Sequence, residues 1–514
     1  MKYVLTLIQL WVGFLSICAS YPKANIWIIP SVESPQVYRN YAQTSKVHLE
    51  MARGEVEHIQ LVFPSKVNEE YRFTFDRYLK GIQISARELK KMNGYYDALV
   101  PFKNQLKCTD TLTAVWITVQ CPSRVPVGKY HQTIKIEGSK HFTIQLDYNV
   151  HHTTIPLKSS IPITVGVENR CMTECLNDKE ADKERQRWVD FVLSYRMTPV
   201  FGTQITPERW QYEHSFSPWA WNDKRSIRLL NDRRYSCYML PFFTLSENEL
   251  ASLLCNIQKK GKLKESLFYI WDEPAYMEDY EQIKRKVNII RKYASDARIL
   301  TTFFCGPRNG PRKGDLYAVF DYLKHHIHVA TISLAPCKGN EEEVQHIRYK
   351  VPEGIDWWSY VCWQPGGNEP NFLLQMKGIQ QRAIMWRTWK NGSQGFLYWN
   401  CNIYHKRNPF TYITDMPHGD GILIYPGDIL GCKGPIASAR LERWRDGAEE
   451  MELLRLVEKN YSKEKADTLL NIVYSSPLSF IEKAHNIPFF RKELLDQLDK
   501  TIPIDYKLRI TDFI

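Results

Sequence analysis

The sequence lacks a long apolar run anywhere after its first twenty residues. No later stretch of the 514-residue chain is long and apolar enough to cross a bilayer. We therefore expect no integral membrane segment once the leader is removed. Arginine- or lysine-rich runs are missing too, and a net charge of +11 is modest for this length, so we expect no nucleic-acid partner.

The first twenty residues are the exception. Lys2 precedes an apolar run over residues 3–17, and the small residues Ala19 and Ser20 follow. This order is typical of a secretory signal, which predicts a secreted or periplasmic protein, with the cell surface also open. Cys18 suggests lipid anchoring, but Ile17 stands where a lipoprotein has a small residue, so we rank that second.

Cofactor motifs are also absent. We find no glycine-rich phosphate loop, metal-ligand spacing or nucleophile elbow, so we expect no cofactor. Cys171 and Cys175 lie close together without further ligands nearby, which favours structural thiols over a metal site. The twelve cysteines, Cys18 among them, are scattered and do not form a disulfide framework. Disulfide pairing and oligomeric state remain open.

Aromatic residues are abundant. The 15 Trp and 29 Tyr exceed what packing needs, and aromatic faces suit sugar rings as well as cores, although packing accounts for most of them. Residues 21–158 alternate polar and apolar side chains in short segments with turns between them, which predicts a β-sandwich. This domain either binds glycan or buttresses its neighbour, and we favour buttressing.

After Ser160 the pattern changes to strands alternating with helices, which predicts a (β/α)8 barrel over residues 159–434. The weakest part is residues 210–231, which we expect to be a long loop with a short helix. Residues 435–514 are expected to form helices packed on the barrel, with Ser438 capping one that runs through Asn460. The eight predicted strands cover residues 161–167, 200–205, 237–243, 267–273, 299–304, 327–334, 357–363 and 395–400.

The fourth strand carries the most informative residues. Its apolar run from Leu267 leads directly into Asp272, Glu273 and Pro274. Proline cannot continue a central strand and biases Glu273 away from the helical region, so we expect Glu273 to be extended at the rim. Adjacent acids there are costly unless used or paired. A salt-bridged rim, or a cap for the helix beginning at Met277, is the plainer alternative.

The barrel model turns this pair into a mechanistic hypothesis. The ends of strands five to eight bring no carboxylate, and strand one offers only Glu168. A retaining glycosidase with a protein nucleophile needs a second acid about 5 Å from the first. Without one, the substrate's own 2-acetamido group can attack the anomeric carbon. We then expect Glu273 to be the general acid/base and Asp272 to orient and stabilise the acetamido group.

Aromatic residues on other strands are expected at the same rim. They could stack on a pyranose or line an acetamido pocket, although about half should be plain packing. The candidate substrate-binding residues are Trp271, Tyr360, Trp363, Tyr398, Trp399 and Asn400. Asp420 and Arg440 could also reach the site, but we expect structural roles for both.

Four sequence motifs stand out together. They are residues 269–274 (YIWDEP), 358–362 (WSYVC), 382–386 (RAIMW) with 395–400 (GFLYWN), and 419–427 (GDGILIYPG) followed by 438–447 (SARLERWRDG). With these motifs the chain resembles the secreted β-N-acetylgalactosaminidases of glycoside hydrolase family 123 and their larger group of relatives. The resemblance covers nearly the whole chain after the leader.

The resemblance implies a β-sandwich, a (β/α)8 barrel, and retaining, acetamido-assisted removal of terminal β-linked N-acetylgalactosamine from a glycan or glycolipid. It gives Glu273 the acid/base role and Asp272 the acetamido-orienting role. Two alternatives stay open. One is a β-hexosaminidase of different sugar specificity, and the other is a catalytically silent glycan-binding surface protein.

Overall fold

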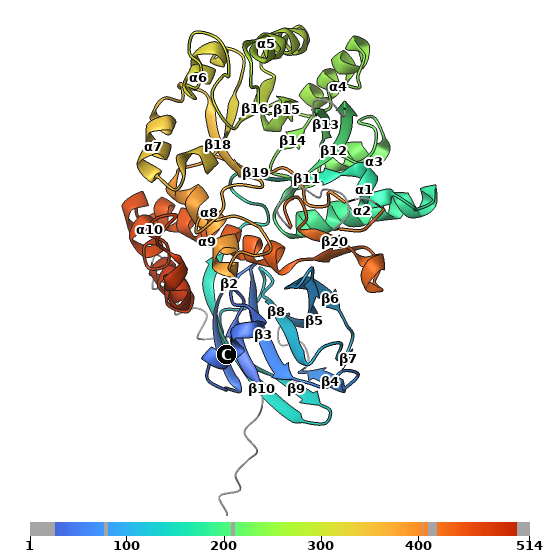
Figure 1. Ribbon diagram of the computed structural model, residues 1–514, viewed down its shortest axis with the longest axis vertical. Coiled ribbons are helices and arrows are strands. Elements are labelled where there is room, and N and C mark those ends of the chain that lie inside the picture. The colour runs from blue at the N-terminus through green and yellow to red at the C-terminus, as the bar shows by residue number, and fades with distance from the viewer. Residues whose placement is uncertain (1–25, 77–80, 207–210, 405, 410–418, 501–514) are drawn as a thin grey trace, which may run out of the picture.

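The computed structural model of the protein describes residues 26–76, 81–206, 211–404, 406–409 and 419–500 (Figure 1). It confirms the predicted fold class, since two β-sheets come first, a barrel follows, and helices complete the chain. The leader and Cys18 lie outside the described residues, so secretion and lipid anchoring stay predictions. Among the described residues, no helix is long and apolar enough to cross a membrane.

The N-terminal region is two five-stranded sheets, ordered β1-β3-β8-β5-β6 and β2-β10-β9-β4-β7. The short helix η1 (Pro35–Asn40) follows β1. The strands are β1 (Trp27–Pro30), β2 (Lys46–Arg53), β3 (Val56–Pro64), β4 (Glu70–Phe75), β5 (Gln83–Met92), β6 (Tyr95–Pro101), β7 (Gln105–Lys107), β8 (Leu112–Gln120), β9 (Gly128–Glu137) and β10 (His141–Thr154).

Burial along the strands explains which sheet faces the rest of the molecule. In β9 buried and accessible residues alternate, as expected where one face is solvated. Strand β3 is instead buried at eight consecutive positions. Its Leu61 packs into the core between the two sheets, while Val62 packs into the main core shared with the barrel and its helices. The β1–β3–β8 sheet therefore lies between the second sheet and the C-terminal half (Figure 1).

The barrel is built from all eight predicted strands, with one addition. Its sheet runs β13-β12-β11-β19-β18-β17-β16-β15-β14, and every pairing is parallel except β12 with β13. The Phe216 amide donates to the Met239 carbonyl (2.7 Å), which links the end of β13 to β14. The strands are β11 (Ile163–Glu168), β12 (Thr198–Thr206), β13 (Gln211–Ser215), β14 (Tyr238–Met239), β15 (Ser266–Trp271), β16 (Arg298–Phe303), β17 (Val329–Ser333), β18 (Asp356–Val361) and β19 (Phe396–Tyr398).

Strand β13 corrects the expectation of a loop over residues 210–231. This stretch lacks clean alternation because β13 is an inserted antiparallel strand whose partner, β12, fixes its register. The helix α3 (Lys224–Leu229) follows it, capped by Asp223, whose side chain accepts from the Arg225 amide (2.8 Å).

Helices cover the outside of the barrel (Figure 1). Helix α5 begins at Met277, as expected. Helix α8 begins at Gly378, where the Gln380 side chain accepts from the Lys377 amide (3.0 Å). The barrel helices are α1 (Asn169–Thr173), α2 (Asp178–Ser194), α4 (Glu247–Lys259), η3 (Leu263–Glu265), α5 (Met277–Arg291), α6 (Ala318–Leu323), η4 (Ala335–Cys337), α7 (Glu341–Tyr349) and α8 (Gly378–Lys390).

The C-terminal part is organised by helix α9 (Ala439–Asn460), which lies between barrel and sandwich. Ser438 caps it as predicted, accepting from the Leu441 amide (3.1 Å). The remaining elements are β20 (Ile424–Pro426), η5 (Gly427–Leu430), β21 (Pro435–Ala437), α10 (Lys463–Leu470), η6 (Ile481–Asn486) and α11 (Ile487–Asp499).

The charged residues of α9 from Arg440 to Glu452 are buried, and only some of their ion pairs run along the helix. Arg445 pairs with Glu442 one turn away, whereas Asp446 pairs with Arg382 of α8 (3.0 Å). Arg440 reaches Asp97 of β6 (2.9 Å) and several backbone carbonyls, so it is structural, as expected.

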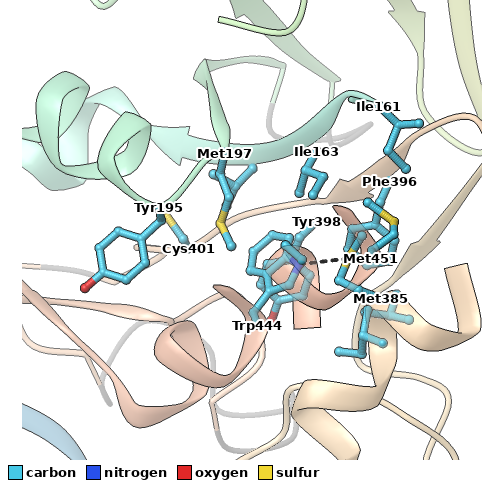
Figure 2. Packing of buried hydrophobic residues seen from close by; sticks show 14 of the residues in the cluster. Ile161, Ile163, Tyr195, Met197, Met385, Phe396, Tyr398, Cys401, Trp444 and Met451 are labelled. Carbon is cyan, nitrogen blue, oxygen red and sulfur yellow. Dashed lines mark hydrogen bonds between the residues drawn. The ribbon is translucent and has the colours of Figure 1, made fainter. Parts of the chain in front are cut away.

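Trp444 of α9 connects this helix to the barrel wall. Its ring lies 6.0 Å from that of Tyr398 and 5.7 Å from that of Phe396, both in β19, and its indole N–H points to the Met385 sulfur of α8 (Figure 2). This contact is fully buried, so α9 fixes the strand that leads into residues 399–402 at the barrel mouth.

Candidate active site

A cavity opens at the carboxyl ends of the barrel strands, where barrel enzymes carry their active sites. Its volume is about 570 Å³, including space open to solvent. Its walls come from only part of the barrel, namely β11, β12, β13, β15, β19 and the residues that follow β19. The lining residues are Thr164, Gly166, Val167, Val200, Gly202, Tyr212, His214, Tyr269, Asp272, Leu397, Tyr398, Trp399 and Asn400.

The two predicted catalytic carboxylates lie at this mouth, but the backbone there differs from expectation. Strand β15 ends at Trp271, and Asp272 and Glu273 form a bend. Glu273 has a left-handed φ of 44°, so the expected extended conformation is wrong. Pro274 disfavours the right-handed helical region for Glu273, and the Glu273 amide donates to Thr302 Oγ1 (3.0 Å), which holds the turned conformation. Such strained backbone concentrates at functional sites.

Asp272 is held rigidly through one of its carboxylate oxygens. Its Oδ1 accepts from the Tyr269 hydroxyl (2.7 Å) and from Thr302 Oγ1 (2.7 Å). In the part of the chain that the structure describes, Oδ2 has no hydrogen-bond partner. The carboxylate therefore keeps one oxygen free, at the cavity wall, to accept a hydrogen bond from a ligand.

Glu273 has a different neighbour. The Tyr360 hydroxyl of β18 donates to its Oε1. Tyr360 is almost fully buried, so its position is set by the barrel interior. Glu273 itself does not line the cavity that Asp272 lines, which places the two carboxylates of the pair toward different parts of the mouth.

Both carboxyls are open to solvent through the mouth, but protein surrounds them on the other sides. Desolvation, together with the adjacent Asp272 charge, raises the pKa of Glu273 to about 7, against the opposing Tyr360 hydrogen bond. Burial also raises the pKa of Asp272, while the hydrogen bonds from Thr302 and Tyr269 favour its ionised form. The two carboxyls therefore favour a state in which they carry one proton between them, and near neutral pH that proton is on Glu273.

His214 of β13 is a site residue that sequence reasoning missed. Its ring stacks on that of Tyr269 at 4.2 Å with a 10° interplanar angle, and it lines the cavity. Burial lowers the pKa of His214 to about 3, so the imidazole is neutral and can either donate or accept a hydrogen bond. No local sequence pattern indicated His214 as a site residue, because the segment that forms β13 was expected to be a loop.

Four of the predicted aromatic and polar residues do reach the mouth. Tyr360 contacts Glu273, and Trp399 and Asn400 line the cavity. Tyr398 also borders it, but its ring points into the core, where its hydroxyl donates to Asp420 Oδ1 (3.2 Å). Asn400 is buried, and its Oδ1 accepts from the Asn402 amide (2.9 Å), which fixes the turn after β19.

The other two predicted residues lie elsewhere. Trp271 packs in the layer between the barrel and α5, with Lys286 Nζ 5.8 Å from its ring. The bulge in β15 between Tyr269 and Trp271 separates it from the cavity face. Trp363 lies on the rim just after β18, 42% exposed, and its ring faces that of Phe304.

Asp420 was expected to have a structural role, but it contacts Trp399, which lines the cavity. It is 3% exposed, its Oδ1 also accepts from the Trp399 indole N–H (3.1 Å), and its Oδ2 is buried without a partner. Burial raises the pKa of Asp420 to about 6. Glu168, at the end of β11, is buried as well, with its pKa raised to about 7. Among the described residues, no group of three potential ligands is placed to hold a metal ion.

Comparison with known proteins identifies the family to which this barrel is similar. The model of the glycoside hydrolase 123 catalytic domain matches residues 183–457, just over half of the chain, and this range contains Asp272, Glu273 and Asp420. No curated protein matches in sequence.

Solved structures add a likeness in fold. A family 123 glycoside hydrolase from Clostridium perfringens, described for glycolipid glycan hydrolysis, has a TM-score of 0.62 at 14% identity, covering 95% of this chain and 100% of its own. At that identity the likeness shows a shared fold. A family 2 β-galacturonidase from Eisenbergiella tayi has a TM-score of 0.35 at 8% identity, covering 77% of this chain and 89% of its own.

Proposed function

Because this chain belongs to glycoside hydrolase family 123, we propose that it is a retaining exo-glycosidase that removes terminal β-linked N-acetylgalactosamine from glycans or glycolipids. The substrate's 2-acetamido group serves as the nucleophile. The observation that carries this proposal is the pair Asp272–Glu273. Each carboxylate accepts a hydrogen bond from a different tyrosine, and the two face different parts of the barrel mouth.

In the first step the acetamido oxygen attacks the anomeric carbon while Glu273 donates a proton to the departing glycosidic oxygen. A pKa of about 7 suits this role, because Glu273 is then protonated at the start and can act as base afterwards. Asp272 accepts the acetamido N–H through its free Oδ2, and its charge stabilises the positive oxazolinium ion that forms.

In the second step water opens the oxazolinium ion from the opposite face. Glu273, now ionised, takes a proton from that water and so returns to its starting state. Two inversions at the anomeric carbon leave its configuration unchanged. Tyr269 and Thr302 keep Asp272 in one orientation throughout, so little reorganisation is needed as charge develops.

The cavity suits the N-acetylgalactosamine unit itself. It borders Asp272 rather than Glu273, and its walls combine glycine backbone, Trp399 and the neutral His214. A small, partly apolar pocket with a few fixed polar groups is the usual form of a sugar site. The glycolipid part of the proposal is supported only by analogy with the Clostridium perfringens enzyme. We also propose secretion, on the strength of the apolar leader.

The test is hydrolysis of three aryl β-glycosides, the N-acetylgalactosaminide, the N-acetylglucosaminide and the plain galactoside, by wild type and by Glu273→Gln. We expect turnover of the first and little or none of the plain galactoside. Glu273→Gln should lose about 10²–10⁴-fold in kcat/KM, less with a good leaving group. Preference for the N-acetylglucosaminide would mean that the enzyme is specific for N-acetylglucosamine. Equal cleavage of the plain galactoside would overturn the acetamido-assisted mechanism. Binding without turnover would favour the silent glycan-binding alternative.

A further inference from the structure

The surroundings of the two carboxylates divide the mouth of the barrel into two sides. The cavity beside Asp272 is lined by residues of β11, β12, β13, β15 and β19 and by the residues that follow β19. The neighbours of Glu273 come from the other side, from Tyr360 of β18 and from the segment after β16. An acid that protonates a glycosidic oxygen stands between the sugar being released and the group that follows it. The side around Glu273 is therefore where that following group must lie.

An exposed aromatic side chain stands on this second side. Trp363 follows Tyr360 by three residues and is 42% exposed, and its ring is nearly parallel to that of Phe304, with centroids 6.5 Å apart and an 18° angle. Phe304 comes directly after β16, whose Thr302 holds Asp272. Two near-parallel aromatic rings at a rim suit the apolar face of a pyranose.

Trp363 is held in place, although it is exposed. The buried Asn371 side chain donates to the carbonyls of Cys362 (2.9 Å) and Pro365 (2.8 Å), which flank it. These bonds fix the backbone on both sides of the indole. An aromatic ring that is pre-positioned in this way loses little conformational freedom when it binds a ligand.

A positive charge completes the second side. Arg308 is exposed, and its charge acts on Glu273, where it lowers the carboxyl pKa. The loop that carries it is fixed, because the Arg308 amide donates to the Ala275 carbonyl (2.7 Å). Its guanidinium lies 5.9 Å from the Tyr276 ring centroid and has hydrogen-bond partners in Tyr276 and Cys305, but it makes no ion pair with any described carboxylate and its five N–H donors exceed these partners. It can therefore donate hydrogen bonds to the oxygens of a sugar.

We propose that Trp363, Phe304 and Arg308 form a subsite for the sugar that follows N-acetylgalactosamine. This inference rests on the proposed function, since it takes Glu273 as the proton donor to the oxygen between the two sugars. The substrate is then an oligosaccharide or the oligosaccharide headgroup of a glycolipid. A single N-acetylgalactosamine attached to a non-sugar group would leave this side of the site unused.

The test compares two substrates that differ only in the leaving group. N-acetylgalactosaminyl-β-galactoside fills the subsite, whereas N-acetyl-β-galactosaminyl fluoride leaves it empty. We expect Trp363→Ala to lower kcat/KM on the disaccharide about tenfold more than on the fluoride, as the loss of one aromatic contact of about 1.5 kcal/mol predicts. Trp363→Tyr should restore most of the difference, and Arg308→Ala should lower the same ratio.

Tyr349→Ala is the matched control, because Tyr349 is an exposed aromatic at the end of α7 and 86% accessible. It should change neither rate. An unchanged ratio in Trp363→Ala would overturn the subsite while leaving the proposed function standing. Failure of wild type to cleave either substrate would overturn the proposed function, and the subsite with it.

Discussion

At the scale of single residues, the site depends on two tyrosines that hold two adjacent acids. Tyr269 donates to Asp272, and Tyr360 donates to Glu273. Each hydrogen bond favours the ionised form of its carboxyl, so each lowers that group's pKa against the effect of burial. In the proposed mechanism Asp272 must be ionised and Glu273 protonated. The two tyrosines should therefore control opposite limbs of the pH profile.

Tyr360→Phe removes only the hydroxyl on Glu273. The pKa of Glu273 should rise, because its ionised form loses a donor. Activity requires the protonated form, so the alkaline limb of kcat/KM should move to higher pH. The measurement is the pH dependence of aryl β-N-acetylgalactosaminide hydrolysis from pH 4 to 10.

The companion variant Tyr269→Phe tests the other acid. Loss of its hydroxyl should raise the pKa of Asp272 and move the acidic limb to higher pH. Because the two carboxyls titrate as a pair, small movements of the opposite limb are expected in each variant. An alkaline limb that stays in place, or moves to lower pH, in Tyr360→Phe would contradict the assignment of Glu273 as the acid.

At the scale of elements, the site depends on how closely the first and last barrel strands approach. Gly166 of β11 lies against β19, and a Cβ there would overlap the backbone carbonyl of Trp399. Gly202 of the adjacent β12 lines the same cavity, but its Cβ would lie 3.5 Å from the Tyr212 ring, an ordinary contact. The two glycines therefore form a natural pair for comparison.

Gly166→Ala should displace Trp399 and Asn400 from the cavity wall and strain the β11–β19 pairing. We expect a loss of unfolding free energy of about 1–3 kcal/mol or more, as for other overpacked cores, together with a large loss of activity. Gly202→Ala should change the stability by less than about 1 kcal/mol. Urea unfolding and aryl-glycoside hydrolysis measure both effects, and equal behaviour of the two variants would refute this account of the barrel closure.

The helices and strands also show which features could be predicted from the sequence alone. The eight parallel strands, the capped helix α9 and the Asp272–Glu273 pair were all foreseen, because buried strands, helix caps and adjacent acids leave local patterns. Strand β13 and His214 were missed, because an inserted strand depends on its partner rather than on its own sequence. The turned backbone of Glu273 depends on Thr302, 29 positions away, which no local pattern reveals.

At the scale of the whole molecule, the sandwich and the C-terminal helices are joined by buried charges. Arg491 of α11 pairs with Glu55 (2.6 Å) and Glu57 (2.8 Å) at the start of β3, and it lies 3.6 Å from Glu450 of α9. All four residues are buried. Glu450 also pairs with Arg382 of α8 (2.6 Å), so removal of the Arg491 cation would leave Glu55 and Glu57 without an ion-pair partner away from water.

Arg491→Met should therefore lower the unfolding free energy by about 3–5 kcal/mol, the usual cost of breaking a buried ion pair. The neighbouring Lys492→Met is the control, since Lys492 makes only an exposed pair with Asp496 and should change the stability by about 0–1 kcal/mol. Thermal or urea unfolding measures the difference. A similar, small effect of both variants would mean that the buried charges do not hold the two regions together.

The central claim is that the substrate supplies its own nucleophile, and a series of modified substrates tests it most directly. The series consists of aryl β-galactosaminides whose 2-acetamido group carries zero, one, two or three fluorine atoms. Fluorine withdraws electrons from the acetamido oxygen and weakens it as a nucleophile without changing the sugar. The account predicts that kcat/KM falls steeply with each fluorine in wild type. A rate that does not depend on fluorine would contradict it and would require a carboxylate of the protein as the nucleophile.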